Sequence, residues 1–306
     1  MDSDNIHDTT RAVLETAAAR LGVPVQDARL LRLHSNASYA LPSAGLVIRI
    51  ATSQRVLGPV TASIAVTRWL AGRGFPCTVP ADIDDQPFVI AGHVVSAWQY
   101  IPTTGTPAPT PAEMGNLLRD LHARSDPPYP LPSLDDPFAS VAAAISQAPD
   151  AVPPASRSWL ENRITFLRRQ WSALDFPRPV GLIHGDAHIG NLMRAASGQA
   201  VLGDWDHVAA GPREWDLAQI HYMDRRFGQA GTDGIDAFTA AYGWDIRTWP
   251  GLGTLIAIRE ITGLAPYIRS ARNRPGYGQQ LTFRLHTLQT GDMQARWDLA
   301  QRPGRR

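Results

Sequence analysis

A change of sequence pattern at Pro102 is the feature that most constrains how this chain of 306 residues can fold. The residues before it contain short β-rich runs separated by turn residues, and such runs predict strands. The predicted strands cover residues 28–34, 39–41, 45–51, 88–91 and 93–100. Gly92 joins the last two as a predicted hairpin. Periodic apolar residues predict helices over 9–21 and 60–71.

Helices dominate the sequence after Pro102. Four prolines between residues 102 and 111 predict a stiff connector. The helices predicted beyond it cover residues 111–124, 136–147, 155–172, 213–226, 233–242, 251–270 and 279–299. Two short strands, 180–183 and 200–203, interrupt them around a polar loop. We therefore predict an α+β fold with two lobes: a small antiparallel-sheet N-terminal lobe, residues 1–101, and a mainly helical C-terminal lobe, residues 102–306.

The composition argues against several classes of protein. The formal net charge is +1, so no basic surface for nucleic acid or an anionic membrane is expected. Cys77 is the single cysteine, which excludes an intramolecular disulfide and a cysteine-based metal site. No apolar run approaches the roughly 20 residues that span a bilayer, and the first ten residues lack a signal-peptide pattern. We expect a cytoplasmic protein that binds neither nucleic acid nor membrane.

Residues 182–193, LIHGDAHIGNLM, carry the sharpest chemical signal. An apolar strand leads into His-Gly-Asp, which ends at Asp186, and Asn191 follows five residues later. Asp204 comes at the end of the next apolar run. Phosphoryl transfer needs a carboxylate that orients the attacking hydroxyl and accepts its proton, and hard oxygen ligands for the metal ions that bridge phosphate oxygens. An Asp and an Asn on one tight loop, with a second Asp from a nearby strand end, can supply these groups.

This arrangement resembles the aminoglycoside phosphotransferase family and its choline-kinase and homoserine-kinase-like relatives, which have a protein-kinase-like fold. The family pattern is His-Gly-Asp, four residues, Asn, a strand and an Asp-centred metal motif. Here the motif residues read His184-Gly185-Asp186, Asn191 and Gly203-Asp204-Trp205-Asp206. Segment 212–218, PREWDLA, is similar to the family segment whose Asp anchors the catalytic loop.

The resemblance implies a small-molecule kinase that uses Mg²⁺ and ATP or GTP. Asp186 would be the base or hydroxyl-orienting group, and Asn191 and Asp204 would hold Mg²⁺. His184 and Asp216 would support the loop structurally. The acceptor would be a hydroxyl of an antibiotic-like or sugar-like molecule, although the residues give no direct sign of a role in resistance.

The nucleotide phosphates would then lie against loop 34–38, where backbone N–H groups and Ser35, Asn36 and Ser38 could hold them. A plain hairpin turn is the alternative. The resemblance also implies that backbone groups at Gln99 and Tyr100 meet the nucleotide base.

Arg49 occupies the position where the family often has a phosphate-binding Lys, and the chain contains no Lys at all. It could bind phosphate or point outward from an edge strand. The acid expected to pair with it is missing, because no Glu lies between Glu15 and Glu113, and Ser63 stands about where that acid is expected.

The charge of the last hundred residues bears on the acceptor. From His207 onward the chain has nine acidic and thirteen basic residues, a balance that argues against a strongly cationic acceptor. Arg259 and Glu260 either border the acceptor pocket or form an ion pair on a helix surface.

Two other functions stay open at this point. A two-metal hydrolase could use the acids and histidines of the motif, which are His184, Asp186, His188, Asp204 and Asp206. A catalytically silent nucleotide-binding protein would explain the replaced Lys and the missing Glu.

Overall fold

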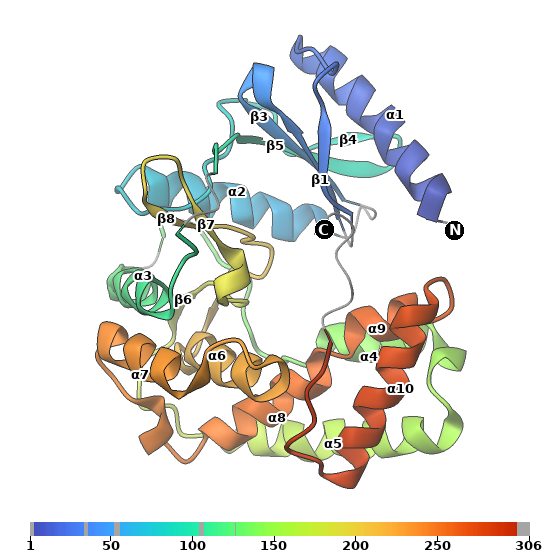
Figure 1. Ribbon diagram of the computed structural model, residues 1–306, viewed down its shortest axis with the longest axis vertical. Helices are drawn as coiled ribbons and strands as arrows, with labels where there is room; N and C mark the ends of the chain where they lie inside the picture. The colour runs from blue at the N-terminus through green and yellow to red at the C-terminus, as the bar shows by residue number, and fades with distance from the viewer. Residues whose placement is uncertain (1–2, 34–35, 52–55, 104–106, 126, 299–306) are drawn as a thin grey trace.

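The computed structural model describes residues 3–33, 36–51, 56–103, 107–125 and 127–298, and of residues 3–6 it describes the backbone. Its first third is a five-stranded antiparallel sheet in the order β1-β2-β3-β5-β4 (Figure 1). The strands are β1 (Arg29–Leu33), β2 (Asn36–Leu41), β3 (Leu46–Ala51), β4 (Phe88–Ile90) and β5 (His93–Gln99). The predicted hairpin across Gly92 is confirmed by the pairing of Ile90 with His93.

Successive side chains of a strand point to opposite faces of the sheet, and apolar and polar residues alternate over parts of β2 and β3, so the two faces differ. One face is apolar and packs against helix α1 (Ser3–Leu21), whose Val13, Leu14 and Ala17 are buried there. On this face Tyr39 of β2 pairs with Ile48 of β3. The other face carries the polar residues of the same strands and is turned away from α1. It is this second face that reaches the candidate site.

Helix α2 (Leu57–Ala71) links the sheet to the rest of the molecule. Its Val66, Trp69 and Leu70 are buried in a cluster that also contains Cys77 and Leu202. Leu202 ends strand β8 (Ala200–Leu202), which pairs with β7 (Leu192–Arg194). This hairpin therefore lies next to α2, as Figure 1 shows.

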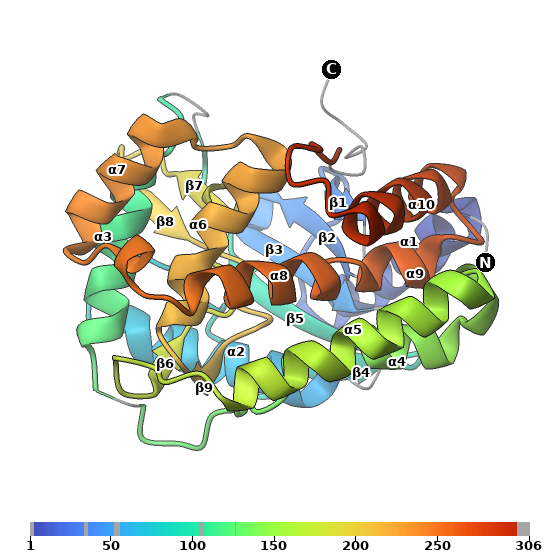
Figure 2. The same cartoon turned by 90° about the horizontal axis from the view of Figure 1, so that it is seen from below.

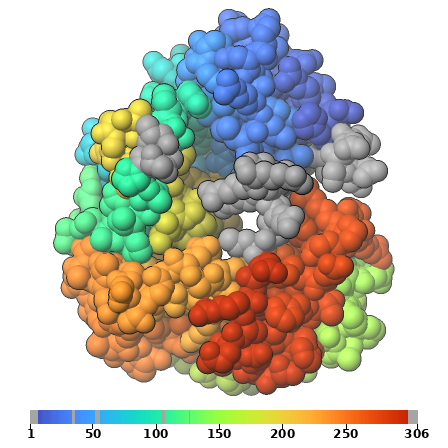
Figure 3. Space-filling view, viewed as in Figure 1, coloured from blue at the N-terminus to red at the C-terminus, as the bar shows by residue number. Residues whose placement is uncertain are grey.

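Helices form most of the remainder, and Figure 2, which views the molecule from below, shows several of them side by side in front of the sheet. They are α3 (Pro111–Ala123), α4 (Ala139–Gln147), α5 (Pro154–Ser172), α6 (Glu214–Phe227), α7 (Gly231–Tyr242), α8 (Leu252–Thr262), α9 (Ala265–Ser270) and α10 (Pro275–Thr290). A second short pair, β6 (Gly181–Ile183) with β9 (Ala209–Gly211), lies among them. The α+β class with a small antiparallel sheet followed by helices is confirmed. Figure 3 shows the sheet region in blue at one end and the last helices in orange and red at the other.

Several predicted boundaries are wrong for identifiable reasons. The helix predicted over 251–270 is two helices, because Pro266 in the first turn of the second helix has no N–H with which to continue the first. The helix predicted over 279–299 begins at Pro275 and ends at Thr290, since Gly291 adopts a positive φ of 69°. Strands β7 and β9 were not predicted, because their sequences, LMR and AAG, contain no β-branched residue.

None of the helices in the described part of the chain is long and apolar enough to cross a membrane. The division of the molecule at residue 101 stays a prediction.

Candidate active site

The predicted catalytic loop connects β6 to β7 and makes its sharpest turn at Gly185. Gly185 has a φ of +84°, and a side chain there would meet the carbonyl oxygen of His207 at 2.1 Å. Only glycine fits both the conformation and the space. A short 3-10 turn, Ile189–Asn191, then brings the chain into β7.

Asp216, in the first turn of α6, fixes the start of this loop. Its Oδ2 accepts from the N–H of His184 at 2.7 Å, and its Oδ1 accepts from the N–H of Gly185 at 2.8 Å. The ring of His122 lies 3.1 Å from Oδ2. Burial acts to raise the pKa of Asp216, but the hydrogen bond and charge of His122 and the nearby His184 outweigh it and lower that pKa. These contacts fit the supporting role implied for Asp216.

His184 is fully buried and has both ring nitrogens engaged with the backbone. Its Nε2 lies 3.0 Å from the carbonyl oxygen of Gly203, and the N–H of Asp186 donates to its Nδ1 at 3.3 Å. The ring thereby joins the catalytic loop to the end of β8. A residue used in this way is unsuited to metal binding, which weakens the hydrolase alternative. Nor do the described residues include a group of three His, Cys, Asp or Glu that could hold a metal.

Asp186 belongs to the catalytic loop and faces α6, and its side chain is 33% exposed. Gln219 of α6 donates to its Oδ1 at 2.8 Å, and Nε2 of His188 lies 3.7 Å from its Oδ2. Burial acts to raise the pKa of Asp186, but His188, His207 and Arg259 together lower it below its usual range. The group is therefore ionised at neutral pH, as a proton acceptor must be.

The two predicted metal ligands lie together. The side-chain amide of Asn191 donates to the carbonyl oxygen of Asp186 at 2.9 Å. The backbone carbonyl oxygen of Asn191 accepts from the N–H of Gly203 at 2.9 Å, which brings the next residue, Asp204, beside Asn191. Asp204 has a φ of +61°, an uncommon conformation for a residue other than glycine. One carboxylate and one amide oxygen, with phosphate oxygens and water, form a donor set that suits Mg²⁺.

Two arginines from the sheet contact the acids after β8. Nη2 of Arg49 lies 2.7 Å from Asp206 and 3.3 Å from Asp204, and Nη1 of Arg32 lies 2.7 Å from Asp204. Burial acts to lower the pKa of Arg49, but the two aspartates outweigh it and raise that pKa. Arg49 therefore points toward the acids after β8 and not outward.

Asp206 takes the place of the missing glutamate as the partner of Arg49. Ser63, in the helix where that glutamate was expected, is buried, and its hydroxyl has no hydrogen-bond partner among the described residues. Asn36 also donates to Asp206, at 2.9 Å.

The predicted phosphate loop is shorter than expected. Asn36 and Ser38 belong to β2 and not to a loop, and Ser35 lies outside the described residues. The pattern was misleading because Asn and Ser favour turns. Both residues nevertheless lie on the polar face of the sheet, because Ser38 pairs with Arg49.

In the segment predicted to meet the nucleotide base, the backbone N–H groups of Gln99 and Tyr100 are already hydrogen-bonded within the protein. The N–H of Gln99 donates to Val79, and that of Tyr100 donates to Gly45, each at 2.8 Å. A base at this position would therefore rely on the carbonyl groups of these residues.

The surface ion pair between Arg259 and Glu260 is not found, whereas their place at the border of the acceptor pocket stays a prediction. Both are buried, and each has a different partner, so they form no surface ion pair. Glu260 accepts from Nε of Arg226 at 2.6 Å. Arg259 donates to the carbonyl oxygens of Gly185 at 3.0 Å and Trp215 at 2.8 Å, so it ties the catalytic loop to the start of α6.

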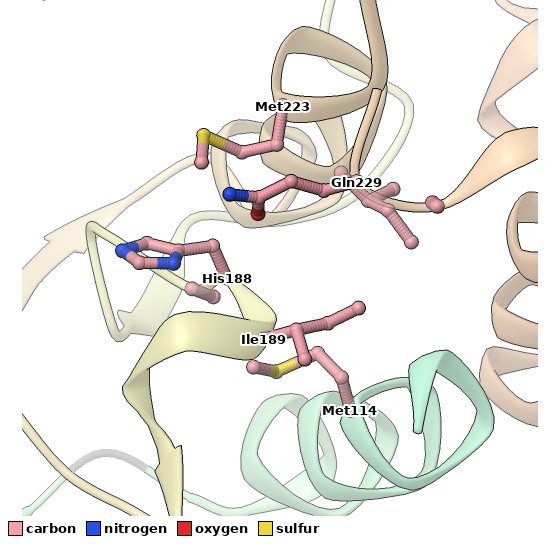
Figure 4. A pocket seen from close by; sticks show the side chains of 8 residues that line it. Met114, His188, Ile189, Met223 and Gln229 are labelled. Carbon is pink, nitrogen blue, oxygen red and sulfur yellow. The ribbon is translucent and has the colours of Figure 1, made fainter. Parts of the chain in front are cut away.

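A small pocket is lined by loop residues that follow Asp186 in the sequence, and Figure 4 shows His188, Ile189, Met223, Gln229 and Met114 around it. Ala187, Ile220 and Ala230 complete its lining. No acidic and no Trp, Tyr or Phe side chain lines it. A second pocket lies at the polar face of the sheet and includes Arg49, Asn36, Ser96 and Asp206.

The sequence alone did not assign Gln219, Arg32 or His122 to the site, and it gave Asp206 no role beside Arg49. Gln219 lies three residues after Asp216, one helical turn along the same face, and this spacing could have indicated it. Arg32 and Asp206 meet other site residues only through contacts between distant parts of the chain.

Comparison with known proteins agrees with this geometry. The sequence profile of the phosphotransferase enzyme family (APH) matches residues 28–253, whereas no curated protein sequence matches the chain significantly. An amicoumacin kinase, solved with AMP-PNP and Ca²⁺, superposes with a TM-score of 0.66 at 13% identity over 94% of this chain and 95% of its own.

Two further solved structures have the same fold. A choline/ethanolamine kinase family protein from Mesorhizobium loti has a TM-score of 0.62 at 17% identity, over 92% of this chain and 96% of its own. An aminoglycoside phosphotransferase from Streptomyces rimosus has a TM-score of 0.61 at 14% identity, over 86% and 99%. Because the family profile covers most of the sequence, the chain belongs to the APH phosphotransferase family and is a small-molecule kinase that transfers phosphate to a hydroxyl group.

Proposed function

We propose that the protein transfers the γ-phosphate of ATP or GTP to a hydroxyl of a small, weakly charged acceptor, with Asp186 as the base. The observation that supports this most is the grouping of Asp186, Asn191 and Asp204, which the backbone hydrogen bonds at Asp186 and Gly203 hold together. Neighbours of the same fold are described with AMP-PNP and Ca²⁺ or with GDP, in keeping with a nucleotide and a divalent metal here.

In this mechanism Asp186 orients the acceptor hydroxyl and takes its proton as the oxygen attacks the γ-phosphorus. The bond from that phosphorus to the bridging oxygen breaks, and the nucleoside diphosphate leaves. Mg²⁺, held by Asn191 and Asp204, would supply neutralisation of phosphate charge. Gln219 and Arg259 keep the loop and its carboxylate in place during the transfer.

The nine acidic and thirteen basic residues from His207 onward support an acceptor without a high positive charge, and the lining of the small pocket beside His188 agrees with this. A polycation needs carboxylates around it, and a quaternary ammonium group such as that of choline is usually held by aromatic rings. The lining of Met114, Ile189, Ile220 and Met223 offers neither. The cavity is small, so only a small apolar end of an acceptor would enter it, and the exposed Gln229 at its edge could bind a polar group of that acceptor.

The test is acceptor-dependent consumption of ATP and GTP with Mg²⁺. The panel should contain matched sets of aminoglycosides, choline and ethanolamine, neutral sugars, and neutral antibiotics with free hydroxyls. Turnover with a neutral acceptor is expected. Turnover only with polycations would refute the acceptor class, and nucleotide binding without turnover for any acceptor would favour the silent binding protein.

A further inference from the structure

A row of polar side chains crosses the sheet on the face that meets Asp204. Arg32 of β1 is paired with Ser38 of β2, Ser38 with Arg49 of β3, and Arg49 with Ser96 of β5. Residues paired directly across antiparallel strands point to the same side of the sheet. The row therefore places two guanidinium groups on one face, on either side of a hydroxyl.

A β-bulge puts Arg32 into this row. The pairing of β1 with β2 shifts between Leu30 and Arg32, so Leu31 has no direct partner and Arg32 lies opposite Ser38. Without the extra residue Leu31 would stand opposite Ser38, and Arg32 would point to the other face. Leu31 is instead 54% exposed.

The two arginines converge on one carboxylate. Arg32 lies 2.7 Å from Oδ2 of Asp204, and Arg49 lies 3.3 Å from its Oδ1. Arg49 has a second acidic partner in Asp206, whereas Asp204 is the one ion-pair partner of Arg32 among the described residues. A metal ion bound to Asp204 would replace that partner and leave the Arg32 charge beside the metal-bound phosphates.

We propose that Arg32 is an additional phosphate-binding residue, which reaches the terminal phosphates of the nucleotide from β1 beside Ser38 and Arg49. This inference rests on the proposed function. In the free protein Arg32 pairs with Asp204, and on nucleotide binding it exchanges this carboxylate for a phosphate oxygen. The exchange is favourable because the Arg32 side chain is 47% exposed, and exposed ion pairs contribute little, whereas a guanidinium binds phosphate strongly.

The two arginines also supply the positive charge that a phosphate-binding lysine would provide, since the chain has no lysine. One arginine replaces the expected lysine, but it is held by two aspartates and is less free to follow the phosphates. The second arginine, at the exposed edge of the sheet, supplies a cation that can move with them.

Calorimetric titration with Mg·AMP-PNP and with AMP tests the proposal. We expect Arg32→Ala to weaken AMP-PNP binding by about 10-fold or more and AMP binding by less than about 2-fold, as for loss of one charge-assisted contact to the outer phosphates. Arg32→Lys should retain most of the affinity. Arg29→Ala is the matched control, because Arg29 lies on the same strand and forms no ion pair with a described residue.

Unchanged or tighter AMP-PNP binding by Arg32→Ala would overturn the proposal, since Arg32 would then only compete for Asp204. Equal losses in Arg32→Ala and Arg29→Ala would overturn it as well, because they would indicate general electrostatics. Failure of the wild-type protein to bind any nucleotide would refute the proposed function itself. Because Arg32 is exposed, the melting temperature of its variants should match that of the wild type.

Discussion

Nε2 of Gln219 donates a 2.8 Å hydrogen bond to Oδ1 of Asp186, and Gln219 is only 3% exposed. The amide thus fixes one oxygen of the proposed base and leaves the other for the acceptor. We predict that Gln219→Met, which keeps the size but removes the donor, lowers kcat by about 10-fold. Nucleotide affinity should stay within about 2-fold, because no described nucleotide-facing residue contacts Gln219.

Gln229→Met is the control for this prediction, since Gln229 lines the proposed acceptor pocket and has no hydrogen bond to Asp186. It should raise KM for the acceptor and leave kcat nearly unchanged. If Gln219→Met also changes KM alone, the amide has no part in orienting the base.

Two glycines with the same backbone conformation allow a test of the catalytic loop. Gly185 and Gly198 both have a φ of +84°, but only Gly185 lacks room for a side chain. Gly198→Ala should cost about 1 kcal/mol from the left-handed conformation alone. Gly185→Ala must also displace the His207 carbonyl, so it should lose more stability and most activity. Urea unfolding and kinetic assays of the two variants give the comparison, and equal effects would contradict the close approach at Gly185.

His221 should make stability depend on pH. Burial lowers the pKa of this histidine to about 4, whereas in the unfolded chain it is near 6.5. Between these values the unfolded state binds more protons, so stability is complete above pH 6.5 and falls as the pH drops toward 4. The loss by pH 5 should be about 2 kcal/mol.

The measurement is the free energy of unfolding in urea at pH 7 and pH 5 for the wild type and His221→Leu. Other titrating groups affect both proteins alike, so the variant should show a smaller loss between the two pH values. Parallel pH dependence in the two proteins would mean that His221 is not the cause.

Asp204 should determine the metal dependence of nucleotide binding. We predict that Mg²⁺ strengthens AMP-PNP binding to the wild type and has little effect on Asp204→Asn, because the variant loses the charged ligand. Asp233→Asn, on the exposed side of α7, is the matched control. The readout is AMP-PNP affinity with and without Mg²⁺, and a retained Mg²⁺ effect in Asp204→Asn would remove Asp204 from the metal site.

The core of the site was predictable because its residues are close in sequence. Asp186 and Asn191 share one loop, and Asp204 follows the next strand, so strand patterns and side-chain chemistry were enough to bring them together. The order of strands and helices was likewise readable from apolar spacing and turn residues, and it gave the α+β class.

The rest depends on contacts that local patterns do not encode. Arg49 meets Asp206 across 157 positions of sequence, and Arg32 reaches Asp204 across 172. The side of the sheet to which Arg32 points depends on a one-residue bulge in β1. Each is a tertiary effect that overrides the pattern of the segment itself.

The central claim is that Asp186 acts on the acceptor hydroxyl, and Asp186→Asn tests it most directly. Nucleotide affinity and acceptor-dependent turnover should be measured on the same preparation of wild type and variant. We predict that kcat falls by about 10²- to 10⁴-fold while AMP-PNP affinity stays within about 3-fold, because the amide cannot accept the proton. Turnover close to that of the wild type would contradict the assignment of Asp186 as the base.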